Sequence, residues 1–428
     1  MDQLSSSELE NFKNSVGIKF QLYNSLFTSL PFHRIEKTGI LLTLFLSHCE
    51  DGYKKRQSPK EIVEQFFQKF TSITTEQEQR DLLFRFVQYT ERQVVLFDAV
   101  EDAAFCEIND TIGIGTLKQL ENKIFQEGKG EALIEKLKTF SVTLVLTAHP
   151  TQFYPGSVLG IINDLSNALK TNNAEQVNRY LQQLGKTPLL KKQRPTPYDE
   201  AISLVWYLEN VFYGAVGKCT SYVKQHFVGV DQLHNSFIKM GFWPGGDRDG
   251  NPNVTVETTL KVAEALRSSI IKCYYREVRS LKRRLTFKGV DTILAELEMR
   301  LFQNIFVPDN HTEITGEEIL KPLFEIRKII IYQNNSLFLE LLDQLIDKVT
   351  VFGVHFALLD IRQESSVHGN VLEAIAERKE GLPKNYKTLN EEEKINVLVT
   401  AKDEVNPDHY EGLVKDTLQS IQAIKTIQ

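Results

Sequence analysis

The sequence predicts a mostly helical protein with a small parallel β-sheet. Long stretches repeat apolar residues at the spacing of a helix, which predicts many amphipathic helices. Two apolar runs, at residues 143–146 and 351–359, have the length of strands and end in polar residues. Strand, loop and helices recur in that order along the chain. This order favours parallel strands whose carboxyl ends carry the chemistry.

Composition and charge are those of a globular protein and exclude one class of partner. Of the 428 residues, 42% are hydrophobic and 25% are charged, which are ordinary values for globular domains. The net charge of −6 argues against a general nucleic-acid surface, so we expect no nucleic-acid partner. An anionic substrate would therefore need locally placed arginines.

Cysteine usage and hydropathy indicate a cytoplasmic protein. The four cysteines are widely spaced and form no C-x-x-C pair, which fits a reducing compartment and offers neither a disulfide framework nor a zinc site. The first residues are polar and acidic, unlike a signal peptide. No apolar run approaches the roughly 18 to 20 residues that span a bilayer, so we expect no membrane contact.

Residues 1–140 are expected to form an N-terminal helical region. The apolar run at residues 40–46 predicts a buried helix segment, and Ser58 begins a capping box with proline at the first helical position. Apolar residues from Phe84 to Val100, including Val87 and Val94, follow helical spacing. We expect this stripe to lie in the core, which is the usual role of such stripes.

The stretch at residues 143–152 places a histidine where a predicted strand ends. Pro150 disfavours a helix at His149 and turns the chain, so the imidazole is expected at the mouth of the strand. An imidazole there can exchange protons near neutral pH. The alternative is a histidine that only hydrogen-bonds a loop.

Residues 241–253 contain too many glycines and prolines for a helix or a regular strand interior. Such a loop lets the backbone approach a ligand closely, and Trp243 would supply an apolar wall. The alternative is a structural turn in which Arg248 and the flanking Asp247 and Asp249 satisfy one another.

The apolar run at residues 351–359 is expected to place Arg362 at the carboxyl end of a strand. Its planar guanidinium suits a phosphate or a carboxylate. The alternative is that Asp360 or Glu364 pairs with this arginine in an ordinary structural ion pair.

The remaining helices are predicted from caps and periodicity. A long helix begins at Thr255 and ends near Leu285, with an acidic residue in its first turn and arginines near its end. Others are expected over residues 336–349 and after the cap Asn390. Residues 413–427 are amphipathic and reach the last residue without a stop signal, so we expect a helix cut in the middle and a truncated chain.

Three segments together resemble the phosphoenolpyruvate carboxylase family. They are residues 146–151 (LTAHPT), 245–252 (GGDRDGNP) and 359–365 (LDIRQES), and their order and spacing agree with the family. Residues 194–201 (RPTPYDEA) add a weaker match. The resemblance spans nearly the whole chain but covers only about the N-terminal half of a family member.

The resemblance implies a partial (β/α)8 TIM-type barrel over residues 141–428, with about the first three strands and long helical insertions. It also implies a carboxy-lyase that converts phosphoenolpyruvate and bicarbonate to oxaloacetate and phosphate, an anaplerotic reaction. The complete enzyme would use Mg²⁺ or Mn²⁺ and assemble as a homotetramer. Its metal ligands would lie in the missing C-terminal half, so we expect this chain to be inactive alone.

The resemblance also implies roles for residues of this chain. His149 would accept the proton from carboxyphosphate, Arg362 would hold the phosphate and Trp243 would wall the bicarbonate pocket. Arg248 would help to hold the anion. A competing hypothesis from a different class is a non-catalytic interaction or regulatory module that keeps the same partial scaffold.

Overall fold

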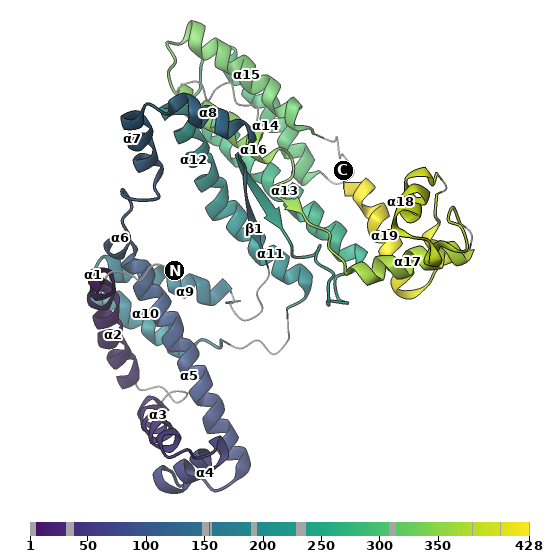
Figure 1. The fold of residues 1–428 in the computed structure, drawn as a ribbon. Coiled ribbons are helices and arrows are strands. Elements are labelled where there is room, and N and C mark those ends of the chain that lie inside the picture. The colour runs from purple at the N-terminus through teal and green to yellow at the C-terminus, as the bar shows by residue number, and fades with distance from the viewer. Residues whose placement is uncertain are drawn as a thin grey trace. The chain divides into compact units, whose positions relative to one another are not determined.

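The structure is a computed structural model that describes residues 6–30, 38–147, 154, 156–189, 195–227, 237–307, 314–378, 380–402 and 404–427. Helices form most of it, and one three-stranded parallel sheet lies among them (Figure 1), which confirms the predicted fold class at this level. The chain forms two compact units, residues 1–119 with 150–194 and residues 120–149 with 195–428. The domain boundary expected at residue 140 falls inside the second of these units.

The first unit is helical. Its helices are α1 (Ser6–Phe12), the π-helical turn η1 (Lys13–Gly17), α2 (Ile18–Ser29), α3 (Thr38–Lys54), α4 (Pro59–Phe70), α5 (Glu76–Ala103), α6 (Phe105–Ile108), α9 (Gly156–Lys170) and α10 (Ala174–Lys186). The long helix α5 packs against α2, α3 and α9. The predicted capping box is confirmed, since the Ser58 hydroxyl accepts the Glu61 N–H and the Glu61 carboxylate accepts the Ser58 N–H.

The buried stripe of α5 agrees only in part with the predicted one. Val100 is buried in the core of this unit and Phe97 packs against it, but Phe84, Val87 and Val94 are exposed. Phe86 and Tyr89 are buried in their place. Because α5 carries apolar residues on more than one face, helical spacing alone could not decide which face is buried. The same error affects residues 40–46, where both ends of the run, on α3, are exposed.

The sheet belongs to the second unit. Its strands are β1 (Val142–Leu146), β2 (Ile238–Phe242) and β3 (Leu358–Leu359), paired in parallel in the order β1-β2-β3. In this register Leu146 is opposite Phe242, and Phe242 is opposite Leu359. The carboxyl ends of all three strands therefore meet at one edge.

The predicted strand at residues 351–359 is mostly wrong. Val351 and Phe352 end helix α16 (Leu339–Phe352), and only Leu358 and Leu359 form β3. Phe352 is buried with Phe356 in the core of the unit, their ring centroids 5.1 Å apart. An apolar run without gaps fits either a buried helix end or a strand, which is why periodicity failed here.

The second unit contains further helices besides α16. They are α7 (Leu117–Glu127), which starts in the first unit, α8 (Gly130–Thr139), α11 (Pro197–Tyr207), the π-helical turn η2 (Leu208–Phe212), α12 (Tyr213–His226), α13 (Val256–Lys282), α14 (Val290–Phe306), α15 (Gly316–Gln333), α17 (Ser365–Arg378), the 3₁₀ turn η4 (Tyr386–Thr388), α18 (Glu391–Thr400), the 3₁₀ turn η5 (Pro407–His409) and α19 (Gly412–Ile427). The predicted helix from Thr255 is α13, and the Thr255 hydroxyl caps it. Met240 and Phe242 of β2 are buried in one cluster with residues of α13 and α16.

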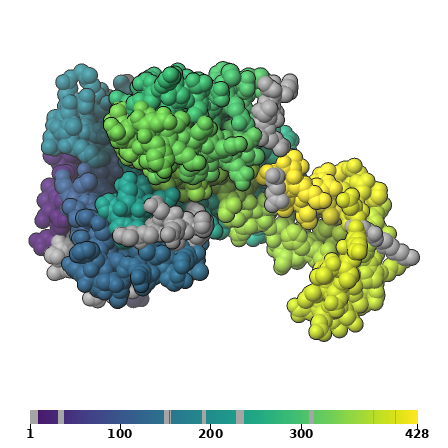
Figure 2. Space-filling model, turned by 90° about the horizontal axis from the view of Figure 1, so that it is seen from above, coloured from purple at the N-terminus to yellow at the C-terminus, as the bar shows by residue number. Residues whose placement is uncertain are grey.

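Helices α17 to α19 have a small apolar cluster of their own, which includes Val371, Ile375, Tyr386 and Tyr410. They form the yellow-green to yellow lobe in Figure 2. Helix α19 also packs against α13, so this lobe is attached to the helix that follows the glycine-rich loop.

Candidate functional site

The ends of β2 and β3 bring Trp243 and Arg362 together. The Trp243 N–H donates to the Leu146 carbonyl at 3.0 Å, so the residue after β2 stays beside the end of β1. The Asp360 N–H donates to the Phe242 carbonyl at 3.0 Å in the same way. These bonds continue the parallel pairing for one residue past the strands and align the polar residues that follow.

The indole of Trp243 contacts both a carboxylate and a cation from the segment after β3. Its Nε1–H donates to Asp360 Oδ2 at 2.8 Å. The guanidinium carbon of Arg362 lies 4.1 Å from the centroid of the indole ring, within the range of a cation–π contact. Trp243 and Arg362 come from different sequence segments that were both predicted to reach one site, and the structure brings them into contact.

The cation of Arg362 is only lightly compensated. Its Nη1 lies 3.4 Å from Oδ2 of Asp247, and the side chains are 42% and 32% exposed. Such an exposed, long ion pair contributes little stability because water and salt screen it. Among the described residues, Asp247 is the one carboxylate within ion-pair distance of Arg362. An incoming phosphate or carboxylate could displace it with shorter, bidentate contacts.

The glycine-rich loop is tied to the segment that carries Arg362. The Arg362 N–H donates to the Gly246 carbonyl, and the Arg248 N–H donates to the Arg362 carbonyl, both at 3.0 Å. A Cβ on Gly246 would lie 2.3 Å from the Asp360 carbonyl oxygen, so only glycine permits this approach. Gly245 has φ +79°, and its carbonyl accepts the hydroxyl of the buried Thr259 on α13 at 2.7 Å.

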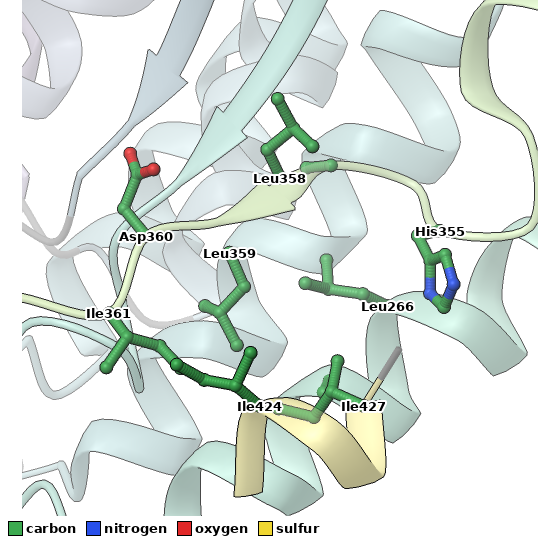
Figure 3. A pocket seen from close by; sticks show the side chains of 10 residues that line it. Leu266, His355, Leu358, Leu359, Asp360, Ile361, Ile424 and Ile427 are labelled. Atoms are coloured by element: carbon green, nitrogen blue, oxygen red, sulfur yellow. The ribbon is translucent and has the colours of Figure 1, made fainter. Parts of the chain in front are cut away.

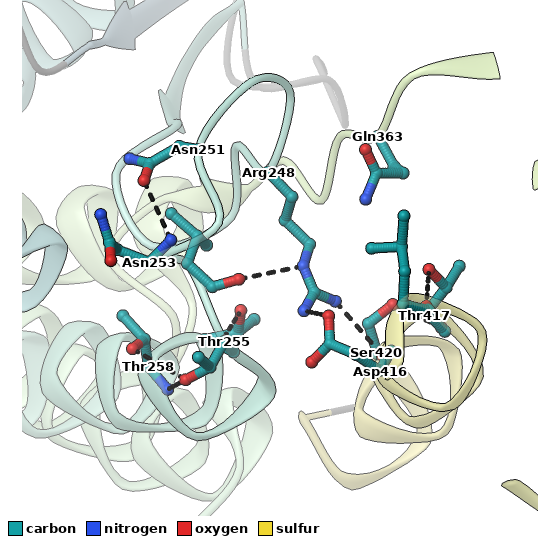
Figure 4. A network of polar contacts seen from close by, with 12 residues as sticks. Arg248, Asn251, Asn253, Thr255, Thr258, Gln363, Asp416, Thr417 and Ser420 are labelled. Carbon is teal, nitrogen blue, oxygen red and sulfur yellow. Dashed lines mark hydrogen bonds and ion pairs between the residues drawn. The ribbon is translucent and has the colours of Figure 1, made fainter. Parts of the chain in front are cut away.

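The side chain of Arg248 extends to Asp416 on α19 (Figure 4). Its side chain is 3% exposed, its Nε–H donates to the Val254 carbonyl at 3.1 Å, and its Nη2 pairs with the carboxylate of Asp416 on α19. This guanidinium therefore attaches the loop to α19, and its expected role in holding an anion stays a prediction. The structural alternative expected Arg248 to pair with Asp247 and Asp249. Its partners are instead the Val254 carbonyl and the Asp416 carboxylate.

His149, the expected proton acceptor, lies outside the described residues. In this part of the chain the last described residue is Thr147, directly after β1, and the description resumes at residue 154. The sequence did not predict the contact of Trp243 with Asp360. It also did not predict the contact of Arg248 with Asp416. Asp416 is 168 residues from Arg248 and carries no local signal of that pairing.

Beside β3 lies a mainly apolar cavity of about 380 Å³, lined by residues of α13, β3 and α19 (Figure 3). Leu266, Leu359 and Ile424 face it, whereas the carboxylate of Asp360 points away from them. His355 is at its rim, and burial together with the charge of Arg267 lowers the pKa of this imidazole. This lining suits an apolar group and not a small anion.

Within the described residues, no three or more His, Cys, Asp and Glu side chains are grouped so that they could hold a metal ion. In the same part of the chain, no helix is both long and apolar enough to cross a membrane.

Comparison with known proteins finds the same family over most of the chain. A family model described as phosphoenolpyruvate carboxylase matches residues 61–306 and 292–428. The phosphoenolpyruvate carboxylase of Gloeobacter violaceus is 25% identical over 394 residues, which cover 74% of this chain and 41% of that protein. Those of Aeromonas hydrophila and Acinetobacter baumannii are each 26% identical and cover 56% and 63% of this chain. The chain spans only 41%, 32% and 35% of the lengths of these three relatives.

Proposed function

The chain belongs to the phosphoenolpyruvate carboxylase family, and we propose that it supplies part of a site where phosphoenolpyruvate and bicarbonate become oxaloacetate and phosphate. The observation that carries the proposal is the Arg362 guanidinium resting on the Trp243 indole at the ends of β2 and β3. An exposed cation with a weak partner, beside an apolar plate, suits a small anion that carries a phosphate.

The proposed scaffold is part of a (β/α)8 barrel. Parallel strands followed by helices, with the polar residues after the strands, are typical of that fold and of its active-site end. The described sheet has three strands, and its edge strand β3 is short. A closed barrel needs further strands. We propose that a polypeptide corresponding to the rest of the longer relatives supplies these strands.

In the proposed reaction a bicarbonate oxygen attacks phosphorus and the bond from phosphorus to the enol oxygen breaks. The products are carboxyphosphate and the enolate of pyruvate. Carboxyphosphate then loses its proton to His149 and divides into CO₂ and phosphate, and the enolate carbon attacks CO₂ to give oxaloacetate. His149 remains in the proposal because it is three residues after Leu146, whose carbonyl accepts the Trp243 N–H.

We assign binding roles to the residues near the ends of the strands. Arg362 would bind the phosphate and compensate its charge. Trp243 would exclude water from the bicarbonate side, which protects carboxyphosphate from hydrolysis. Because the buried guanidinium of Arg248 already has partners on α19 and at Val254, we assign it the role of holding the loop.

The family reaction uses Mg²⁺ or Mn²⁺ to polarise the substrate. The described residues do not fit such a site, since no group of three or more ligating side chains occurs among them. We propose that the metal ligands, like the homotetramer contacts, belong to the complete enzyme. A cytoplasmic location remains part of the same proposal.

The direct test is binding of phosphoenolpyruvate to this chain. Trp206→Phe leaves Trp243 as the single tryptophan, so its fluorescence reports on the site. We expect a saturable change, and we expect Arg362→Gln to weaken binding about 10- to 100-fold because charged hydrogen bonds are lost. Arg300→Gln is the control, because Arg300 is a comparably exposed arginine that pairs with Glu318 on another helix. Equal affinity in Arg362→Gln would contradict the proposal and favour the non-catalytic module.

A further inference from the structure

Asp360 contacts the neutral indole of Trp243 instead of the cation of Arg362. Oδ2 of Asp360 accepts the Trp243 Nε1–H at 2.8 Å, well within the range of a direct N–H···O hydrogen bond. Arg362 has its ion-pair contact with a different carboxylate, that of Asp247. The structural alternative in which Asp360 simply neutralises Arg362 is therefore not the arrangement found.

The backbone of Asp360 is held firmly enough to make this contact directional. Its N–H donates to the Phe242 carbonyl, and its own carbonyl packs so closely on Gly246 that no Cβ would fit between them. The carboxylate thus starts from a fixed point one residue past β3. A hydrogen bond from such a point restricts both side-chain torsions of Trp243.

The orientation of the indole in turn sets the position of Arg362. Asp360 and Arg362 are two residues apart, and both side chains contact the indole of Trp243. The acid holds the edge of the ring through Nε1, and the guanidinium lies 4.1 Å from the ring centroid. A ring that rotated about its side-chain torsions would remove the surface on which the guanidinium lies.

We propose that Asp360 is a positioning residue, which orients the indole of Trp243 and through it the guanidinium of Arg362. Because its contact is with a neutral donor, Asp360 restrains Arg362 without pairing with its charge. Among the described residues its one ion-pair contact is the long contact to Asp247, so the charge remains available to an anion. The geometric part of this inference concerns the protein alone, and only its ligand-binding arm rests on the proposed function.

The geometric arm is measured by NMR of the two indole N–H groups in the ¹⁵N-labelled chain. The chain has two tryptophans, and Trp206→Phe assigns the resonance of Trp243. We expect Asp360→Ala to move the Trp243 resonance upfield and to speed its exchange with water, while the Trp206 resonance stays in place. Asp249→Asn removes a negative charge from the neighbouring loop and is expected to leave both resonances unchanged. An unmoved Trp243 resonance in Asp360→Ala would overturn the proposal.

Asp360→Asn is the second variant, in case Asp360→Ala does not fold. Its amide oxygen still accepts the indole proton but carries no full charge, so the Trp243 resonance is expected to move part of the way. An Asp360→Asn spectrum identical to that of the native chain would also overturn the proposal.

The ligand-binding arm uses inorganic phosphate as the probe and Trp243 fluorescence as the readout. We expect Asp360→Ala to weaken phosphate binding about fivefold, the equivalent of one lost cation–π contact. Asp360→Asn is expected to recover most of this loss. Unchanged phosphate affinity in Asp360→Ala would refute the effect on Arg362. If the native chain bound no phosphate, the proposed function would fail while the NMR result still decided the role of Asp360.

Discussion

The buried guanidinium of Arg248 is paired with the carboxylate of Asp416, a residue 168 positions further along the chain. This contact joins the glycine-rich loop to α19, and it crosses from the core of the sheet unit to the lobe of α17 to α19. The loop that lies beside Trp243 and Arg362 is therefore supported from outside the strands.

Asp416→Ala should destabilise the unit that contains the sheet. It leaves a guanidinium that is 3% exposed without its carboxylate, and such losses cost about 1–3 kcal/mol. Urea unfolding followed by tryptophan fluorescence measures the change, since both tryptophans lie in this unit. The control is Lys261→Ala, which breaks an exposed pair with Glu257 and should cost less than about 0.5 kcal/mol. An equal decrease in the free energy of unfolding in the two variants would mean that the Arg248–Asp416 pair stabilises the protein no more than an exposed ion pair does.

Gly246→Ala should separate the loop from β3. Its Cβ would lie 2.3 Å from the Asp360 carbonyl oxygen, and backbone on both sides has to move to relieve this clash. We expect a lower urea midpoint together with a shifted Trp243 fluorescence. Gly369→Ala is the matched control, because a Cβ there meets nothing within 4 Å. In helix α17 that change should stabilise by about 0.5–1 kcal/mol. A Gly246→Ala protein as stable as the native chain would refute the close approach.

The cysteines should differ strongly in reactivity. Burial, together with the charge of Glu209, raises the pKa of Cys273 to about 12. At pH 8 only about one such thiol in ten thousand is then a thiolate, the reactive form. Iodoacetamide should label the exposed Cys106 in the native chain, whereas Cys273 should be labelled only after unfolding. Peptide mass spectrometry measures both sites in one sample. Labelling of Cys273 at the rate of Cys106 would contradict its burial.

His149→Asn should lower turnover in any preparation that forms oxaloacetate from phosphoenolpyruvate and bicarbonate. Loss of a general base typically costs about 10²- to 10⁴-fold in rate. The KM for phosphoenolpyruvate should change little, because the proposed role begins after phosphoryl transfer. His368→Asn, at an exposed position on α17, is the control. Unchanged kcat in His149→Asn would remove the assigned role.

Local features of this fold could be predicted from the sequence, whereas choices among distant partners could not. The capping box at Ser58 depends on four consecutive residues, and the structure contains it. The choice of Phe86 over Phe84 as a core residue depends on which helices pack against α5, and no local pattern contains that information. Tertiary context overrides spacing in such cases.

The candidate site divides in the same way. Trp243 was selectable because it precedes a glycine-rich loop, and Arg362 because it follows an apolar run of strand length. Their mutual contact, the bond from Trp243 to Asp360 and the pairing of Arg248 with Asp416 all depend on how segments more than 100 residues apart are aligned. The sequence offered Asp360 only as a partner for Arg362. The structure differs because the indole N–H lies where that carboxylate points.

Inside the strands, two residue pairs, Gly241 with Leu358 and Phe242 with Leu359, align β3 with β2, and an isolated bridge between Asp247 and Arg362 follows them. Because side chains alternate along a strand, sliding β3 by a single position would present Ile361 to the indole and turn both the acid and the guanidinium to the opposite face. A compound or substitution that favoured the slipped alignment would thus disable the proposed anion site from a distance, with every one of its side chains chemically intact.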